Sequence, residues 1–303
     1  RDVETKKRVM NSVIEKDIES IEEPAAEQTA ELAKMKAELD SVPKEDFKAI
    51  IGCEVYVARR GDMLLKEEKA DQSGYHLILL AKNEKGYKNL IKMVSLGFTE
   101  GFYSKPRIDK ELLEQNSEGL IALSACLAGE IPRKLLKGDY DGAKDSALWF
   151  NRVFGNDNFY IEIQDHGIME QKRILPDMLR LSNETGIGLV ATNDVHYTEK
   201  EDAKMQKVLI CLQTGKKLNE ESPLEFKTDE FYLKSNEEME HLFDKFPGAL
   251  ENTVKIADMC NFEFEFGNNF FRHGCRFAVS ISQLTPVPAE IIIHTSRNHM
   301  QMC

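Results

Sequence analysis

The sequence predicts an α/β fold in which short buried strands alternate with amphipathic helices. Between residues 49 and 267, short apolar runs are separated by longer segments whose apolar residues recur at helical spacing. The chain has 303 residues, of which 42% are hydrophobic and 30% charged, with 18 Gly and 9 Pro. This length and composition suffice for a sizeable core, and they exclude collagen-like and low-complexity classes for the bulk of the chain.

Five apolar runs are expected to form the strands, at 49–57, 76–81, 120–124, 159–163 and 187–192. Amphipathic segments between them predict helices at 86–96, 139–153 and 169–185. Gly186 ends the last of these, because glycine readily takes the left-handed conformation that follows a helix. Strands joined by helices bring their carboxyl ends to one rim of the fold, where functional side chains gather.

Helices are also expected after the last of these strands. Ser235 and Glu238 have the spacing of a capping box, which predicts the start of a helix that runs through Phe243. Pro247 is expected to open a further helix towards Cys260, because proline is tolerated at the first helical position.

The two ends of the chain differ in composition from the middle. Residues 1–48 contain no Gly and no His, and their apolar spacing predicts short helices separated at Pro24. We interpret them as a charged, solvated helical extension, with a dedicated binding helix as the alternative. Residues 268–303 contain no Lys and one acidic residue, Glu290, and are interpreted as an atypical tail. The expected domains are therefore 1–48, a β/α portion at 49–267, and 268–303.

Charge and cysteine content limit the possible functions. The net charge of −12 disfavours unaided coating of duplex nucleic acid, but the chain could still bind divalent cations, or nucleic acid locally through one basic patch. No apolar run approaches the roughly 20 residues of a membrane span, and no signal peptide is recognisable, so a cytoplasmic protein is expected. The six Cys form no C-x-x-C pair, which argues against a zinc ribbon.

Residue types that bind metals accompany four of the expected strands. Glu54 lies in the first strand, and His76 begins the second. Cys126 follows the third strand, and Asp194 and His196 follow the fifth. In an extended segment these last two side chains would point the same way. Carboxylate, imidazole and thiolate groups bind divalent transition metals, so the pattern indicates a metal cluster that could activate water and hold a phosphate. Taken singly, each side chain has the alternative of an ordinary packed residue.

Five stretches resemble the PHP (polymerase and histidinol phosphatase) domain family. They are IIGCEVYV at 50–57, YHLILLAKNEKGYKNL at 75–90, KPRID at 105–109, LSACLAGEI at 123–131 and TNDVHY at 192–197. The four after the first resemble the branch of this family that forms the N-terminal region of the α subunit of bacterial replicative DNA polymerases. The resemblance covers about residues 49–267.

This resemblance implies a distorted (β/α)7 barrel, similar to a TIM barrel, with up to three metal ions at its C-terminal rim. The implied ligands are Glu54, His76, Cys126, Asp194 and His196, and the implied ions are zinc or manganese, with magnesium as a further candidate. The implied activity is metal-dependent phosphoester or exonuclease hydrolysis. The implied partners are DNA, reached through a parent polymerase, and proofreading or other replisome subunits, with no membrane.

The chain departs from the family pattern at both ends. The family begins with His-x-His and Thr-Asp-His motifs, whereas this chain has no His before His76. We therefore expect an incomplete barrel with an unpaired edge at the strand 49–57, and an incomplete ligand set with weak or absent activity. The polymerase active site is not expected in this chain, so whether it is an enzyme stays open. The abrupt changes of composition at both junctions suggest a truncated, frameshifted or misassembled coding sequence.

Two other functions are open at this point. One is a non-catalytic scaffold that docks to polymerase or proofreading partners, and the other is a free-standing PHP phosphatase. No catalytic residue is assigned beyond the metal ligands. Lys105 and Arg107 are candidate phosphate contacts near the mouth, with solvated charges as the favoured alternative. His166, at the same rim, is a candidate for supporting a metal ligand or for facing the substrate, and a role other than metal ligand is favoured for it.

Overall fold

The computed structural model describes residues 47–218, 220, 226–264, 292–296 and 299–300. The helices expected in 1–46 and most of the expected tail lie outside these residues. Contacts between Cα atoms divide the chain into two units, Arg1–Lys48 and Ala49–Cys303, and the description below concerns the second. None of the described helices combines the length and the apolar character that a membrane span requires.

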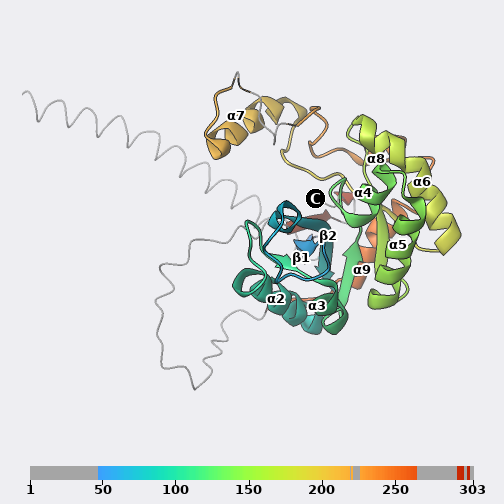
Figure 1. Cartoon of the computed structure of the whole chain (residues 1–303). Coiled ribbons are helices and arrows are strands. Elements are labelled where there is room, and N and C mark those ends of the chain that lie inside the picture. The colour runs from blue at the N-terminus through green and yellow to red at the C-terminus, as the bar shows by residue number, and fades with distance from the viewer. Residues whose placement is uncertain (1–46, 219, 221–225, 265–291, 297–298, 301–303) are drawn as a thin grey trace, which may run out of the picture. The chain divides into compact units, whose positions relative to one another are not determined.

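The strands of the described residues form one mixed sheet (Figure 1). They are β1 (Phe47–Ala58), β2 (Gly74–Ala81), β3 (Arg107–Ile108), β4 (Leu120–Leu123), β5 (Phe159–Ile163), β6 (Leu189–Ala191), β7 (Ile292–Ser296) and β8 (His299–Met300). Their order is β6-β5-β4-β2-β1-β7-β8, and β3 pairs with β1. The five expected strands are confirmed as β1, β2, β4, β5 and β6.

β2 runs opposite to its two neighbours, so the sheet is not the purely parallel one that alternating strands and helices suggest. β2 is antiparallel to both β1 and β4, whereas β4, β5 and β6 are parallel to one another. The first residues of β2 therefore lie at the same rim as the last residues of β4, β5 and β6. The expected unpaired edge at β1 is wrong for its last residues, because Tyr56 and Val57 pair with β3 and because β7 follows β1 in the sheet.

Helices cover the sheet, with α4, α5 and α6 grouped together and α2 and α3 beside β1 and β2 (Figure 1). They are α2 (Glu84–Thr99), α3 (Lys110–Gln115), α4 (Glu130–Leu136), α5 (Tyr140–Phe154), α6 (Met169–Thr185), α7 (Ala203–Thr214), α8 (Asn236–Phe243) and α9 (Glu251–Met259). The sequence did not predict α3, α4 or α7. The first two have only six and seven residues, which is too short for a clear helical period.

Capping side chains define several helix ends as the sequence predicts. The Ser235 side chain accepts a hydrogen bond from the backbone N–H of Glu238, whose own side chain completes the capping box of α8. Gly186 ends α6 with a φ of 72°, in the left-handed region. The last helix begins at Glu251 rather than at Pro247, because turns occupy the residues after that proline.

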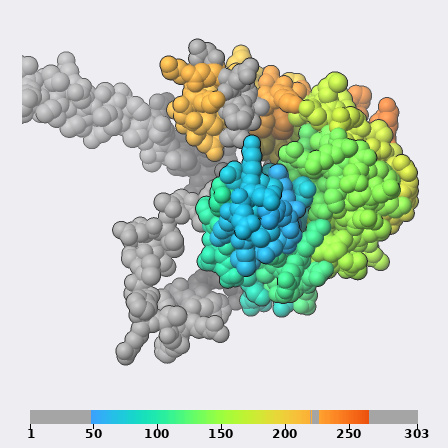
Figure 2. All heavy atoms as spheres, viewed as in Figure 1, coloured from blue at the N-terminus to red at the C-terminus, as the bar shows by residue number. Residues whose placement is uncertain are grey.

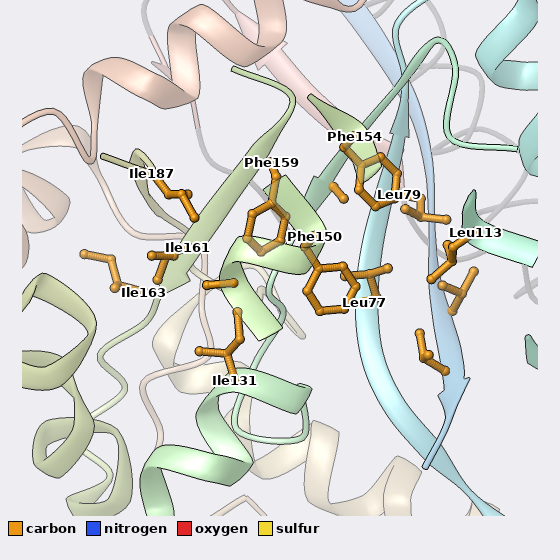
Figure 3. Packing of buried hydrophobic residues seen from close by; sticks show 14 of the residues in the cluster. Leu77, Leu79, Leu113, Ile131, Phe150, Phe154, Phe159, Ile161, Ile163 and Ile187 are labelled. Carbon is orange, nitrogen blue, oxygen red and sulfur yellow. The ribbon is translucent and has the colours of Figure 1, made fainter. Parts of the chain in front are cut away.

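One face of the sheet packs against the helices in the larger hydrophobic cluster. Leu77 and Leu79 of β2 point towards the same cluster as Phe150 of α5 and Phe159 of β5 (Figure 3). The rings of Phe150 and Phe159 stack with their centroids 5.2 Å apart. Burial of each such side chain contributes about 1.5–3 kcal/mol. In the space-filling view, the first strands and the green helices form one continuous surface (Figure 2).

The other face of the sheet carries a smaller apolar cluster and then the polar rim. Because side chains alternate along a strand, Ile78 and Leu80 of β2 point away from the helix-covered face and pack with Ile256 of α9. The same alternation places His76 on this second face, two residues from Ile78. Glu54 shares it, because its Cα lies opposite Ile78 in the β1–β2 register. The rim beyond the small cluster is therefore polar.

Candidate metal centre

Glu54, His76 and Cys126 converge at this rim. The Nδ1 atom of His76 lies 3.1 Å from Oε1 of Glu54 and 3.7 Å from Sγ of Cys126. One ligand atom from each of the three residues lies within 4.8 Å of the other two. All three side chains are partly buried. Within the described part of the chain, no further group of three such residues meets this criterion.

Strand register and one tight turn bring the three residues together. Tyr56 lies opposite His76 in the antiparallel pair, so Glu54 is diagonal to His76 on the same face. The backbone N–H of His76 also donates to the carbonyl of Ala128, at 3.2 Å, which holds the turn after β4 against β2. That turn carries Cys126 and closes where Gly129 N–H donates to the Cys126 carbonyl at 2.8 Å.

The backbone of this turn leaves little space. Ala125 has a φ of 61°, in the left-handed region that non-glycine residues seldom adopt. A Cβ atom at Gly129 would lie 2.1 Å from the carbonyl oxygen of Ser124, so only glycine fits there without a backbone shift. Strained backbone of this kind collects at functional sites.

Burial has the largest effect on the Cys126 thiol. It raises the pKa of the Cys126 thiol to about 12, and the negative charges of Asp194 and Glu54 act in the same direction. A nearby cation would favour the thiolate, because it offsets both the burial and the negative charges. Tyr56 lies beside the group, with its ring edge-on to His76 at a centroid distance of 5.0 Å. Burial, together with Glu54, raises the pKa of Tyr56 as well.

Asp194 and His196 form a second, neighbouring pair. Oδ1 of Asp194 lies 3.4 Å from Nε2 of His196. The expected extended backbone is wrong here, since Asp194 has a φ of 45°, and the turn rather than strand alternation brings the two side chains together. The backbone N–H of His196 donates to the carbonyl of Phe231 at 2.8 Å, which fixes the segment. Burial raises the pKa of Asp194, but the bond from His196 and the charges of His166 and His76 lower it overall.

The five predicted ligands thus divide into three that meet and two that lie close by. Asp194 and His196 are outside the group whose ligand atoms lie within 4.8 Å of one another. They remain within electrostatic range, because the charge of His76 lowers the pKa of Asp194 and that of Asp194 raises the pKa of Cys126.

Arg107 is neither an exposed phosphate contact nor a solvated charge. Its side chain is fully buried, with Nε donating to the Gly101 carbonyl and Nη2 donating to those of Met63 and Leu65 at 2.7 and 2.9 Å. It therefore joins the connection between β1 and β2 to β3. Lys105 is exposed, and its Nζ lies 5.6 Å from the centre of the Tyr56 ring, which in turn meets His76.

His166 is completely buried, so a substrate-facing position is wrong for it. Its Nε2 donates to the Asn193 carbonyl at 2.6 Å, and its Nδ1 accepts from Nε2 of Gln171 at 2.8 Å. Its ring stacks on Phe231 with centroids 4.1 Å apart. Both ring nitrogens are occupied by protein partners, and burial lowers the pKa of the imidazole.

The sequence reasoning missed Glu162 and Tyr56. Glu162 is a buried carboxylate in β5, on the same face of the sheet as Tyr160, and it accepts a hydrogen bond from Thr192, two residues before Asp194. Its signal was the single acidic residue in the otherwise apolar strand FYIEI. Tyr56 could have been found from its place two residues after Glu54 in β1, which puts both on one face.

The part of the sequence that carries this Glu-His-Cys rim matches a known family. The family model described as the PHP domain matches residues 18–166, which therefore belong to the PHP family. The match begins upstream of residue 49, where the resemblance described above begins, and it ends at residue 166.

The relatives are longer proteins. The chain is 50% identical over 218 residues to the DNA polymerase III subunit alpha of Borreliella burgdorferi, which covers 72% of this chain and 19% of the relative. It is 50% identical over 217 residues to that of Treponema pallidum, covering 72% and 18%. For Deinococcus radiodurans the identity is 43% over 229 residues, covering 73% and 17%. The chain spans about a fifth of the length of these relatives.

Proposed function

We propose that this chain is the PHP part of a DNA polymerase III α subunit and that Glu54, His76 and Cys126 hold a divalent metal ion for phosphoester hydrolysis. The convergence of these three side chains is the observation that carries the proposal. The branch-specific motifs and the relatives support a replicative polymerase over a free-standing phosphatase. Polymerase activity itself is assigned to the four-fifths of such a subunit that this chain does not match.

The donor set fits a metal ion. A thiolate, an imidazole and a carboxylate are the ligands that zinc prefers, and manganese and magnesium are the alternatives where carboxylates dominate. Asp194 and His196 are proposed to complete the centre from the neighbouring segment. When bound, such an ion lowers the pKa of a coordinated water and offsets charge on a phosphate.

Lys105 has a proposed role in substrate binding. Lys105 lies exposed next to Tyr56 at the same rim, where its ammonium group would meet a phosphate. A local positive charge is needed, because the chain as a whole has a net charge of −12. A DNA substrate implies a cytoplasmic location and replisome partners.

We expect the hydrolytic activity to be weak or absent. The chain has no His before His76, and the converging group contains a single imidazole, that of His76. Fewer ligands mean weaker binding and a less constrained ion.

Metal binding tests the proposal directly. The purified chain is titrated with zinc against a chromogenic chelator, alongside Cys126→Ser and, as a matched control, Cys211→Ser, which alters a buried cysteine of α7. We expect one or more bound ions, an affinity at least tenfold lower for Cys126→Ser, and little change for the control. A wild-type chain that binds no zinc or manganese would overturn the proposed centre.

Hydrolysis is then measured with single-stranded DNA and p-nitrophenyl phosphate in the presence of manganese or zinc. Turnover that disappears in Asp194→Ala and His196→Ala would show that the centre is catalytic. A chain that binds metal but hydrolyses neither substrate would instead support the scaffold function.

A further inference from the structure

Glu162 connects the ends of the three strands that carry most of the proposed centre. Its side chain is only 5% exposed, and its Oε1 accepts hydrogen bonds from Thr192 Oγ1 at 2.6 Å and from Gln164 Nε2 at 3.0 Å. Its backbone N–H donates to Ser124 Oγ at 2.8 Å. Ser124 precedes Cys126 by two residues, and Thr192 precedes Asp194 by two. Glu162 therefore contacts the residues at the start of both segments that carry proposed ligands.

The second oxygen of this carboxylate is unusual. Oε2 of Glu162 is buried and has no hydrogen-bond partner among the described residues. A buried acceptor without a partner is rare in native proteins, and a functional role or a bound water commonly accounts for it.

Glu162 and Cys126 both line one small cavity. Its volume is about 20 Å³, and its polar lining residues are Glu162, Cys126, Gln164 and Gln171. The remainder of its wall is mostly apolar, from α6 and the start of α4. A volume of this size accommodates one water molecule, and these polar groups supply the two to four partners that a buried water requires.

We propose that Glu162 is a positioning residue of the metal centre, linked to Cys126 through one water in this cavity and to the Asp194 segment through Thr192. The inference rests on the proposed function, because it assigns Glu162 a part in the same centre. It makes the spacing between the two groups of ligands depend on a carboxylate that coordinates no metal ion itself.

Electrostatic coupling supports this arrangement. Burial, together with the charges of Asp194 and Glu54, raises the pKa of Glu162 to about 7, although the hydrogen bonds from Thr192 and Gln164 act in the opposite direction. The charge of Glu162 in turn contributes to the raised pKa of Cys126. Groups that influence one another in this way are close enough to respond to the same bound cation.

Cobalt(II) is the probe for the test, because its visible and near-ultraviolet absorption reports the geometry of a thiolate-containing site. Glu162→Gln keeps an oxygen for Thr192 and Gln164 but replaces the second oxygen with an amide group. We expect the cobalt bands of this variant to shift and the cobalt affinity to fall about tenfold. The melting temperature of the metal-free variant should stay near that of the wild-type chain.

Glu130→Gln is the matched control. Glu130 is also buried, at 6% exposed, and its Oε2 also lacks a partner among the described residues, but its Oε1 contacts lysines and a serine of the α3–α5 region. This variant should lose thermal stability and keep the wild-type cobalt spectrum. Thr192→Val is the second test variant, since it removes the hydroxyl that joins Glu162 to the Asp194 segment, and it should shift the spectrum too.

The outcomes separate the two proposals. If the wild-type chain binds no cobalt, the proposed metal centre fails and this inference fails with it. If the wild-type chain binds cobalt and both Glu162→Gln and Thr192→Val keep its spectrum and affinity, only the positioning role of Glu162 is overturned.

Discussion

The imidazole of His76 and the carboxylate of Glu54 face each other across two antiparallel strands, with Nδ1 and Oε1 3.1 Å apart. The two residues lie far apart in the sequence. The register of β1 and β2 makes them neighbours. The Cys126 thiol approaches the same imidazole nitrogen from the turn after β4, at 3.7 Å. Because His76 is common to both contacts, it is the residue whose loss should affect the site most.

His76→Ala should weaken zinc binding by at least tenfold, because it removes the ligand that contacts both other members of the group. The folded structure should persist, since the side chain is partly exposed and outside the apolar clusters. His241→Ala is the control, because His241 is an exposed imidazole on α8. Zinc titration and circular dichroism of both variants measure the effect, and equal affinities would contradict the assigned ligand.

Substitutions of Arg107 and Lys105 should differ in their effect on the stability of the fold. Arg107→Met removes the side-chain donor to three carbonyl oxygens, two of them in fully buried contacts, so we expect a loss of about 3–5 kcal/mol in the free energy of unfolding. Lys105→Met changes an exposed side chain and should alter stability by no more than about 0.5 kcal/mol. Urea unfolding of the two variants compares these values, and a larger effect at Lys105 would contradict the burial of Arg107.

Glu130 should make part of the stability depend on pH. Burial opposes its ionisation, but Lys110, Ser146 and Lys134 more than compensate, so the pKa of the carboxyl is lowered. A lowered carboxyl pKa stabilises the fold above the unfolded-state value of about 4.3, and that stabilisation is lost as the pH falls through the folded-state value.

Glu130→Gln should therefore cost about 1–3 kcal/mol at pH 7 and less near pH 3, because the stabilisation declines as the pH falls below the unfolded-state value. Urea unfolding at the two pH values gives the difference. If the gap between variant and wild type were the same at both, the pairing of Glu130 with the two lysines would not be the source of its stability.

Much of the fold could be predicted because its signals are local. The strand 159–163 is an apolar run whose bounds the sequence predicts, and the helix after Gly167 ends at a glycine. The direction of β2 could not be predicted, since the alternation of apolar residues is the same for both strand directions. The burial of Arg107 was missed for a related reason, because a charged residue indicates exposure until its partners are known.

The candidate site was predicted in residue type but not in geometry. His76 and Cys126 follow from the placement of metal-binding residues at strand ends, and both lie at the rim. The left-handed backbone of Asp194 leaves no mark on composition or spacing. Glu162 was overlooked because one acidic residue did not alter the expectation of a buried strand, although burial of that carboxylate is what makes it notable.

Gly129 provides a test of how the turn holds Cys126. In Gly129→Ala the new Cβ would lie 2.1 Å from the carbonyl oxygen of Ser124, so the backbone between them must shift. The shift would move the Cys126 thiol away from His76, and we expect about 1–3 kcal/mol lower stability together with weaker zinc binding. Gly138→Ala is the control, because no atom lies within 4 Å of its new Cβ and its φ of 77° alone causes strain. That variant should lose about 1 kcal/mol of stability and keep the zinc affinity of the wild-type chain. Unfolding and zinc titration of both variants separate the two effects, and an unchanged zinc affinity in Gly129→Ala would show that the turn does not set the position of Cys126.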